Sequence, residues 1–365
     1  MNMCLSHPVE GYYMKGDPIG ARGDFITSPE ISQIFGELVG IWLAYQWLEY
    51  GKGRPIRVVE LGPGRGTLMD DILRTFNSIG QTRGRVQAVH LVETSARLRE
   101  EQRTKLSTRV AEDALQWHDN LEELTSSEDL FTVFIAHEFF DAIPIHIIEK
   151  FPDGFQEVLI DIDRTAQAMA ITSTSSPTRN QPSNFHYVLS GKRSPLAHTL
   201  GQSSPRFADL PNGSRIEVSP ASWGIARTAG KLINAPGGGA GLIIDYGDDK
   251  AFGSSFRAFQ KHKIVDVFYQ PGMCDLTANV DFAYLKEALT ATGVICHGPL
   301  TQQVFLTGMG AVVRLQKLLN ATKDSARRAA LEKGAQRLID PLNMGTQYKV
   351  LGISSAPGAT YPFSA

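Results

Sequence analysis

Four short apolar runs mark the chain, and segments with helical spacing follow two of them. The runs are residues 56–61, 86–93, 130–136 and 241–247. The helical patterns cover residues 68–76 and 97–106. Unbroken apolar runs are typical of strands that are buried on both faces of a parallel sheet. The pattern therefore predicts an α/β fold with a doubly wound sheet, in which a ligand binds at the carboxyl ends of the strands.

A glycine-rich turn follows the first predicted strand. Glu60 and Leu61 end the apolar run, and Gly62, Gly64 and Gly66 follow at alternate positions. Glycines adopt backbone angles that a Cβ forbids, and they let the backbone approach a ligand closely. The spacing G-x-G-x-G is one residue shorter than the G-x-G-x-x-G of dinucleotide sites, where a helix N-terminus meets a pyrophosphate. A carboxylate at Glu60 would repel a pyrophosphate, but it suits a cationic ligand.

A second acidic residue, Glu93, ends the next predicted strand. A carboxylate there can accept hydrogen bonds from both ribose hydroxyls of an adenosine, in NAD or in S-adenosylmethionine alike. S-adenosylmethionine carries an ammonium group, a sulfonium and no phosphate, so it suits Glu60 better than NAD does. We therefore predict an S-adenosylmethionine site. An NAD-dependent oxidoreductase is the less favoured alternative, and a purely structural turn is the third interpretation.

Acidic residues also follow the strand predicted at 130–136. Glu138 and Asp141 are three positions apart and would share one face if the segment turns helical. Two carboxylates beside a transferred methyl group could hold a cationic nucleophile, so we predict both as catalytic. The alternative is one capping acid and one surface acid. His137 does not begin an H-E-x-x-H zinc helix, because position 141 is Asp, and no metal site is predicted.

Residues 111–114, AEDA, are a candidate end for the third strand. In methyltransferases that bind S-adenosylmethionine at a sheet of this kind, an acidic residue at that position commonly meets the adenine amino group. Asp113 is therefore a candidate cofactor ligand, and a solvated acidic loop is an equal alternative.

The remaining segments of the chain lie before, within and after this predicted core. Ser28 and Pro29 are typical of a helix start, and the apolar stripe after them predicts a core helix that ends before Gly51. After residue 144 two alternating runs flank a turn at 152–154, which predicts a hairpin within an antiparallel insertion. We expect four segments: 1–54, a loop and helix that cover the cofactor; 55–144, the first part of the core; 145–218, a β-rich insertion on the substrate side; and 219–365, the second part of the core with a C-terminal helix and tail.

Composition excludes some classes of protein. The 365 residues are 42% hydrophobic and 20% charged, as in ordinary globular proteins. The net charge of −2 gives no reason to expect nucleic-acid binding. Cys4, Cys274 and Cys296 have no metal-ligand spacing and indicate reduced thiols. No apolar run reaches membrane-spanning length, and the first residues lack a signal or transit-peptide pattern.

Taken together, these motifs resemble one known family. The segments that carry the resemblance are GDFITSPEISQIFGELVGIW, VVELGPGRGTLMDDILR, VHLVE, AHEFFDAIP, DYG, CDLTANVDF and FLTGMG. They resemble the MidA-type protein arginine methyltransferases, known in mitochondria as a complex I assembly factor, and the likeness runs from about Gly11 to about Leu351. The resemblance implies a class I methyltransferase fold and S-adenosyl-L-methionine as cofactor.

The family's motifs also imply roles for particular residues. Gly62, Gly64 and Gly66 would line the methionine end of the cofactor beside Glu60, and Glu93 would hold the ribose. The segment from Gly23 to Ser32, with Asp24 and Thr27, would fold over the cofactor. Mitochondrial members form symmetric dimethylarginine on a subunit of the complex I peripheral arm, so the resemblance implies a protein substrate and the mitochondrial matrix. Family members have more chain before the GYY segment, and import is implied by kinship alone.

The sequence leaves one further function and several properties open. The fold could be kept as a non-catalytic assembly chaperone, for which a bound cofactor serves only stability. The oligomeric state is also open, a homodimer included, as are the identity of the methylated protein and the number of methyl groups added.

Overall fold

The computed structural model describes residues 1–365 except 8, 15–25, 164–183, 262, 359 and 364–365. These residues form two compact units, each built from separate stretches of the chain. The first unit comprises Met1–Pro18, Ala142–Ala221 and Lys250–Asn279. The second comprises Ile19–Asp141, Ser222–Asp249 and Val280–Ala365.

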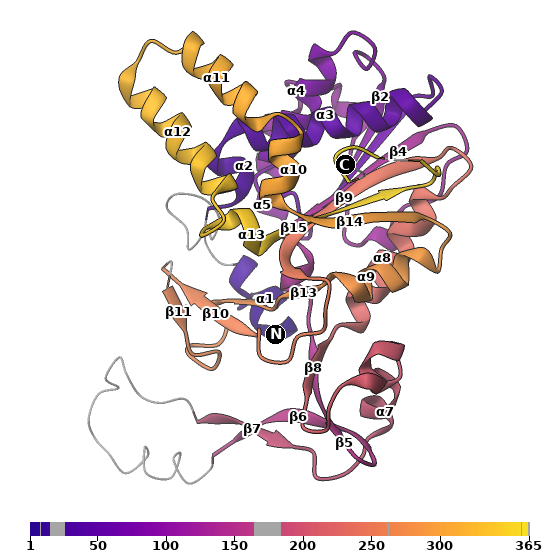
Figure 1. The fold of residues 1–365 in the computed structure, drawn as a ribbon, viewed down its shortest axis with the longest axis vertical. Coiled ribbons are helices and arrows are strands. Elements are labelled where there is room, and N and C mark those ends of the chain that lie inside the picture. Colours follow the sequence, from indigo (N-terminus) through magenta and orange to yellow (C-terminus); the bar gives the residue numbers. More distant parts are fainter. Residues whose placement is uncertain (8, 15–25, 164–183, 262, 359, 364–365) are drawn as a thin grey trace. The chain divides into compact units, whose positions relative to one another are not determined.

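An eight-stranded sheet forms the centre of the second unit (Figure 1). Its order is β14-β15-β9-β4-β1-β2-β3, and β13 pairs with β9 beside this path. Neighbouring strands from β9 to β3 run parallel, whereas β15 lies antiparallel between β9 and β14. The strands are β1 Ile56–Leu61, β2 Val86–Val92, β3 Leu115–His118, β4 Phe131–His137, β9 Gly239–Asp248, β13 Val280–Asp281, β14 Ile295–Thr301 and β15 Tyr348–Ser354. The predicted α/β fold with a largely parallel sheet is confirmed.

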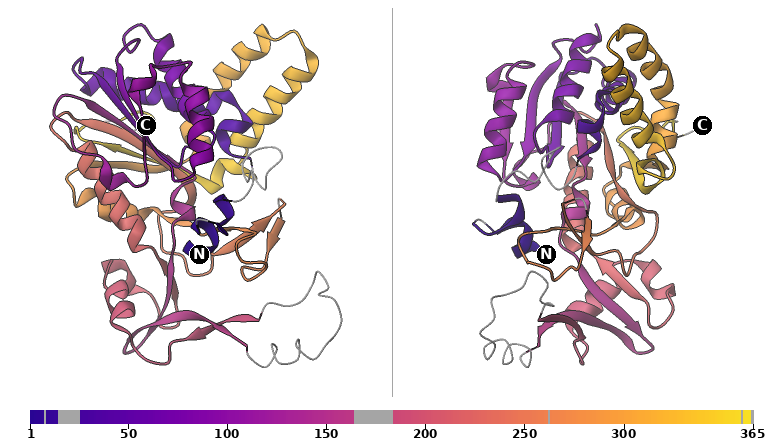
Figure 2. Two further views of the ribbon diagram at one scale, coloured as in Figure 1. Left: turned by 180° about the vertical axis from the view of Figure 1, so that it is seen from behind. Right: turned by 90° about the vertical axis from the view of Figure 1, so that its left-hand side faces the viewer.

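Helices connect these strands. They are α2 Ser28–Ile31, α3 Gln33–Tyr50, α4 Thr67–Ser78, α5 Ala96–Leu106, α8 Pro220–Ile233, α9 Phe282–Thr290, α10 Gln302–Gly308, α11 Ala311–Ala321, α12 Ser325–Ile339 and α13 Met344–Gln347. Short 3-10 turns occur at η2 Glu112–Ala114, η3 Leu121–Glu123 and η4 Phe140–Ala142. Helices α11 and α12 pack against each other within this unit (Figure 2). None of the described helices combines the length and the apolar composition needed to cross a bilayer.

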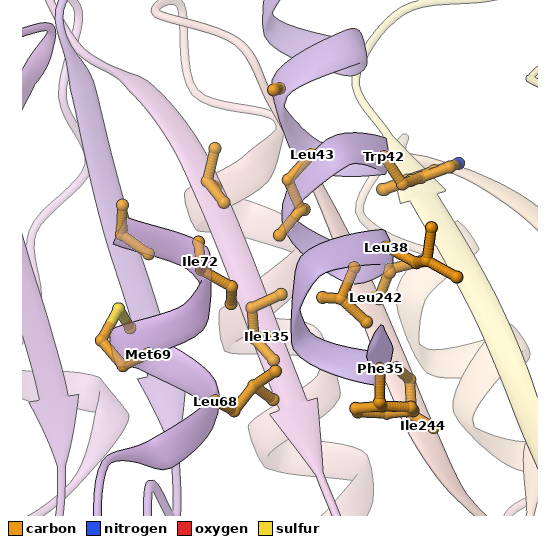
Figure 3. Close-up of a cluster of buried hydrophobic side chains, with 14 of the residues drawn as sticks. Phe35, Leu38, Trp42, Leu43, Leu68, Met69, Ile72, Ile135, Leu242 and Ile244 are labelled. Carbon is orange, nitrogen blue, oxygen red and sulfur yellow. The ribbon is translucent and has the colours of Figure 1, made fainter. Parts of the chain in front are cut away.

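The hydrophobic core lies between α3, α4 and one face of this sheet. Figure 3 shows side chains of both helices directed at β4 and β9. The labelled residues are Phe35, Leu38, Trp42 and Leu43 of α3, Leu68, Met69 and Ile72 of α4, Ile135 of β4, and Leu242 and Ile244 of β9. Burying this apolar surface stabilises the fold by about 25 cal/mol for each Å² removed from water.

The helix predicted to start at Ser28 is divided in the structure. Thr27 is the N-cap of the short α2, and Ser32 interrupts the helix with extended backbone, φ −158°. The Ser32 side chain then accepts a hydrogen bond from the N–H of Ile34 and caps α3. A serine that bonds to its neighbouring backbone competes with helical hydrogen bonds, which explains the break.

The first unit is antiparallel. One sheet has the order β7-β6-β5-β8, and a second has the order β11-β10-β12. The elements are α1 Asn2–Ser6, η1 Tyr12–Met14, β5 His146–Phe151, β6 Gly154–Ile162, β7 Phe185–Leu189, α7 Pro195–Gly201, η5 Pro205–Asp209, β8 Arg215–Val218, β10 Arg257–Gln260, β11 Lys263–Val265 and β12 Asp275–Thr277. The predicted hairpin is present, because β5 and β6 pair from Ile147 with Val158 to Phe151 with Gly154.

Candidate active site

The glycine-rich turn joins β1 to α4 through left-handed backbone. Gly62, Gly64 and Gly66 have φ of +59°, +53° and +71°, a region that side chains with a Cβ rarely adopt. A Cβ built on Gly62 would lie 2.9 Å from Cδ2 of Phe139, so a side chain there would collide with the ring. The turn therefore needs glycine for its backbone angles, and at Gly62 it also needs glycine for space.

Glu60 lies in β1 directly before this turn, and its side chain is only 2% exposed. Burial raises the pKa of the carboxyl to about 8, against the opposing charge of Lys105. Among the described residues, no hydrogen-bond partner reaches Glu60 Oε2. Buried polar atoms are nearly always paired, so this oxygen marks a place for a ligand donor. A cationic group such as the ammonium of S-adenosyl-L-methionine fits that requirement.

Glu93 follows β2 at the same edge of the sheet. Its Oε1 accepts a hydrogen bond from the N–H of Ser95 at 2.8 Å, and Nε2 of Gln102 lies 3.5 Å from its Oε2. Burial raises the pKa of Glu93, and these donors lower it in part. Glu93 as a residue is half-buried, so it is not sealed in the core.

Three carboxyl groups gather where β4 ends beside β9: Glu138, Asp141 and Asp245, which we call the carboxylate cluster. Asp245 is fully buried, and its Oδ2 accepts hydrogen bonds from three consecutive backbone N–H groups, those of Phe139, Phe140 and Asp141, at 3.2, 3.0 and 3.2 Å. Asp245 thus holds the turn that carries the other two acids. Burial first, and then the charges of Asp141 and Glu138, raise its pKa well above the ordinary range.

Two tyrosines on neighbouring strands hold the other two acids. The hydroxyl of Tyr348 on β15 donates to Oε1 of Glu138 at 3.1 Å, and the hydroxyl of Tyr246 on β9 donates to Oδ2 of Asp141. The tyrosines face each other across the strand pair, with ring centroids 5.3 Å apart in an edge-to-face arrangement. Burial and the neighbouring carboxylates raise the pKa of Tyr348 well above 10, so its phenol keeps its proton and stays a donor.

In the structure, Glu138 and Asp141 do not lie on one face of a helix. Its φ is +47°, a left-handed angle that is uncommon for a residue with a side chain. Only Phe140–Ala142 form a short 3-10 turn, so the condition under which Glu138 and Asp141 would share one face of a helix is not met. Such strained backbone is found at functional sites more often than elsewhere. The backbone N–H groups of the next three residues donate to Asp245, which holds the turn directly after this angle.

His137 belongs to the core. It is 7% exposed, its ring packs 5.0 Å from that of Phe35, and burial lowers its pKa to about 3, so the imidazole is neutral. Within the described part of the chain, no three or more His, Cys, Asp or Glu side chains are arranged to hold a metal ion.

The glycine-rich turn and the turn after His137 lie near each other because β1 and β4 are adjacent parallel strands. Leu61 of β1 is paired with Ala136 of β4, so the glycine turn and the turn after His137 leave the sheet side by side. The ring of Phe139 accordingly lies against Gly62. This neighbourhood of strand ends is the place where ligands bind in open α/β sheets.

The remaining predicted residues are less central. Asp113 is exposed and lies in η2, before β3 begins at Leu115. The prediction that it ends a strand is wrong, because the carboxyl end of β3 is at His118. Thr27 is half-buried, and its backbone oxygen accepts hydrogen bonds from the N–H groups of Glu30 and Ile31. Asp24 lies outside the described residues.

Sequence reasoning missed two residues that the fold brings to this site. Tyr348 and Gln102 come from β15 and α5, and no motif singled them out. Tyr348 follows no glycine or acidic signature, and Gln102 sits in a helix rich in charged residues. Only their contacts reveal them.

Known proteins match this chain along most of its length. Residues 38–300 match the model of a family described as "Putative S-adenosyl-L-methionine-dependent methyltransferase". "Protein arginine methyltransferase NDUFAF7, mitochondrial" of Xenopus laevis is 37% identical over 97% of this chain and 79% of the relative. The protein of the same name from Homo sapiens is 36% identical over 97% of this chain and 78% of the relative.

Solved structures agree in fold. The crystal structure of a "likely methyl transferase from Burkholderia thailandensis bound to S-adenosyl-homocysteine" has a TM-score of 0.77 and 25% identity, covering 98% of this chain and 87% of that one. A native crystal structure from the same organism has a TM-score of 0.75 at 24% identity, covering 98% and 87%.

These matches confirm the resemblance seen in the sequence. S-adenosyl-L-methionine, rather than NAD, is the cofactor, which agrees with the buried acid Glu60 before the glycine-rich turn and with the ligand of the bacterial structure. The names of the curated relatives confirm the mitochondrial localisation that the resemblance implied. The chain belongs to this family of S-adenosyl-L-methionine-dependent methyltransferases.

Proposed function

We propose that this methyltransferase acts on the guanidinium group of an arginine within a protein. The observation that carries the proposal is the carboxylate cluster beside the glycine-rich turn. A guanidinium keeps its positive charge at neutral pH, because its pKa is above about 12. Carboxylates are its natural partners, since their two oxygens match its fork of donors. The names of the curated relatives, which are arginine methyltransferases, support this choice of substrate.

The cofactor would be held by Glu60, the three glycines and Glu93. When bound, S-adenosyl-L-methionine supplies a methyl group activated by its sulfonium sulfur. Glu60 would accept hydrogen bonds from the ammonium group of the cofactor, and Glu93 would accept them from the ribose hydroxyls. Gly62, Gly64 and Gly66 would leave room for the methionine part of the cofactor at the backbone.

Glu138 and Asp141 would hold the arginine. Methyl transfer is a direct displacement, so catalysis depends mainly on position and electrostatics. The two carboxylates would orient the guanidinium and draw its positive charge away from the attacking nitrogen. One of them would accept the proton that this nitrogen loses. Tyr348 and Tyr246 would keep the carboxylates in place, and Phe139 and Phe140 would help exclude water.

The identity of the substrate follows from kinship. The resemblance to the MidA-type family supports a subunit of the complex I peripheral arm, in the mitochondrial matrix, as the methylated protein. It also supports symmetric dimethylarginine as the product and a role in complex I assembly. The β-rich segment 145–218 is the part of the chain that we propose recognises this protein.

A labelling experiment tests the proposal. The purified protein is incubated with labelled S-adenosyl-L-methionine and extract from a strain that lacks it, and mass spectrometry locates the label. We expect the label on arginine side chains of one mitochondrial protein. Label on another residue type would contradict the arginine assignment. Binding of S-adenosyl-homocysteine without any transfer would favour a non-catalytic assembly chaperone.

A further inference from the structure

A buried glutamine connects the two halves of the proposed cofactor site. Gln102 lies on α5 and is fully buried. Its Nε2 donates to the backbone oxygen of Gly64 at 2.6 Å and lies 3.5 Å from Oε2 of Glu93. Its Oε1 accepts a hydrogen bond from Nε1 of Trp117 at 2.8 Å. One side chain therefore touches both the glycine-rich turn and the acid expected at the ribose.

The chemistry of the partners allows only one orientation of this amide. The indole nitrogen of Trp117 can only donate, so the amide oxygen has to face it. The NH₂ group, which has two hydrogens, then faces the carbonyl of Gly64 and the carboxylate of Glu93, which can both accept. A glutamate at position 102 would place a carboxylate against two acceptors, and a methionine would keep the volume but lose every hydrogen bond.

Gln102 also packs against the end of the glycine turn. A Cβ built on Gly66 would lie 3.4 Å from Cγ of Gln102, so the side chain stem lies beside this glycine. Trp117 is itself in contact with Arg103, whose guanidinium carbon lies 4.4 Å from the centroid of the indole ring. The amide is thus held from α5, from β3 and from the turn, and its freedom to move is small.

We propose that Gln102 is a positioning residue that sets the separation between the glycine-rich turn and Glu93, so that one cofactor molecule can bind to both at once. The proposal rests on the placement of the cofactor argued above. A ligand that binds at two points gains affinity when the points are already at the right distance. S-adenosyl-homocysteine has both a ribose and a homocysteine part, which corresponds to the methionine part of the cofactor, whereas adenosine has only the part that Glu93 would bind. Loss of Gln102 should therefore harm the larger ligand more.

Calorimetric titration of Gln102→Met with both ligands tests this. We expect the affinity for S-adenosyl-homocysteine to fall at least about tenfold, the scale of one lost hydrogen bond at a binding site. The affinity for adenosine should fall less, by a factor under one third of the factor measured for S-adenosyl-homocysteine. Equal losses for both ligands, or no loss for either, would overturn the proposal. A merely structural role would lower the melting temperature and leave the ratio of the two affinities unchanged.

Gln302 provides a matched control. It is also a fully buried helical glutamine, and its Nε2 donates to the backbone oxygen of Leu338 at 2.9 Å. Gln302→Met should lower the melting temperature and leave both affinities as in the wild type. If Gln302→Met also weakens S-adenosyl-homocysteine more than adenosine, substitution of any buried glutamine produces the effect. That result would contradict a special role of Gln102.

Two more variants separate the possible failures. If Glu93→Ala leaves the affinity for adenosine unchanged, the proposed placement of the cofactor is wrong. If Glu93→Ala weakens both ligands but Gln102→Met weakens neither, only the role of Gln102 is wrong. Should Gln102→Met fail to fold, Trp117→Phe removes the indole donor and keeps an aromatic ring. It should produce the same selective loss to a smaller degree, and a wild-type affinity ratio in this variant would then overturn the proposal.

Discussion

The hydroxyl oxygen of Tyr348 lies 3.1 Å from Oε1 of Glu138, although 210 residues separate the two along the chain. Tyr348 reaches Glu138 because β15 is inserted beside β9, at the sheet edge where β4 also ends. The phenol keeps its proton, so it stabilises the ionised form of the carboxylate and limits its rotation. The proposed catalytic acid is thus positioned by the last strand of the fold.

Tyr348→Phe should slow methyl transfer about tenfold, on the scale of one hydrogen bond to a charged group. The ring and its contact with Tyr246 remain, so the affinity for S-adenosyl-homocysteine should be unchanged. Single-turnover kinetics and a titration measure the two quantities. Tyr361→Phe is the control, because it removes a hydroxyl that donates to the backbone oxygen of Gly308, outside the carboxylate cluster. A wild-type rate for Tyr348→Phe would mean that Glu138 needs no support from this phenol.

Glu138→Gln should reduce the rate of methyl transfer at least about 100-fold, the usual scale for losing a key polar catalytic group. The substitution keeps the volume of the side chain and removes its charge, so a guanidinium would lose its partner. Binding of S-adenosyl-homocysteine should stay nearly the same. Asp141→Asn should have a smaller effect if Asp141 only supports the substrate. If Glu138→Gln loses cofactor binding instead, Glu138 belongs to the cofactor site and its proposed role is incorrect.

Gly62→Ala should abolish cofactor binding and methyl transfer. The new Cβ would meet the ring of Phe139 at 2.9 Å, and the left-handed backbone at φ +59° would be strained. Gly84→Ala is a matched control, since Gly84 has φ +70° and open space around its Cβ position. Both variants should lose about 1 kcal/mol of unfolding free energy from the backbone angle alone. Equal cofactor affinity in the two variants would show that contact with Phe139 is irrelevant to the site.

Binding of S-adenosyl-homocysteine should release a proton from Glu60 at pH 6.5. The pKa of Glu60 is about 8 in the free protein, so its carboxyl holds a proton below that pH. An ammonium group beside it favours the carboxylate, so the affinity should rise as the pH rises toward 8. Calorimetry in buffers of different ionisation enthalpy counts the protons released. Glu60→Gln should release about one proton fewer, and an equal count would exclude Glu60 as the ligand of the ammonium group.

The raised pKa of Glu60 should also make the stability of the ligand-free protein depend on pH. The folded-state pKa of Glu60 lies above the ordinary value of 4.5, so its favourable contribution is complete below pH 4.5 and is lost as the pH rises through about 8. Glu60→Gln cannot ionise and should flatten the decline in unfolding free energy over this range. Chemical denaturation at several pH values measures this slope. Parallel declines in both proteins would mean that Glu60 titrates normally.

Local sequence was sufficient to predict the parallel strands β1, β2, β4 and β9 and the glycine-rich turn after β1. Apolar runs specify buried strands because they remove hydrocarbon surface from water, and the glycines at 62, 64 and 66 permit a turn that other residues could not make. Glu60 and Glu93 could be predicted as cofactor ligands because each lies beside the end of a predicted strand in the chain. The predicted hairpin after residue 144 depended on the same short-range chemistry.

Tertiary structure alone decided the arrangement of the site. The turn after Glu138 is held by Asp245, which accepts hydrogen bonds from three N–H groups of this segment more than 100 residues away. Tyr348 and Gln102 reach their partners only because β15 pairs with β9 and α5 packs beside the turn. Asp113 was wrongly predicted to end a strand for a related reason. The bounds of β3 depend on its pairing with β2, and this pairing begins only at Leu115 of β3. Contacts between distant segments have no periodic signature, so a single sequence does not reveal them.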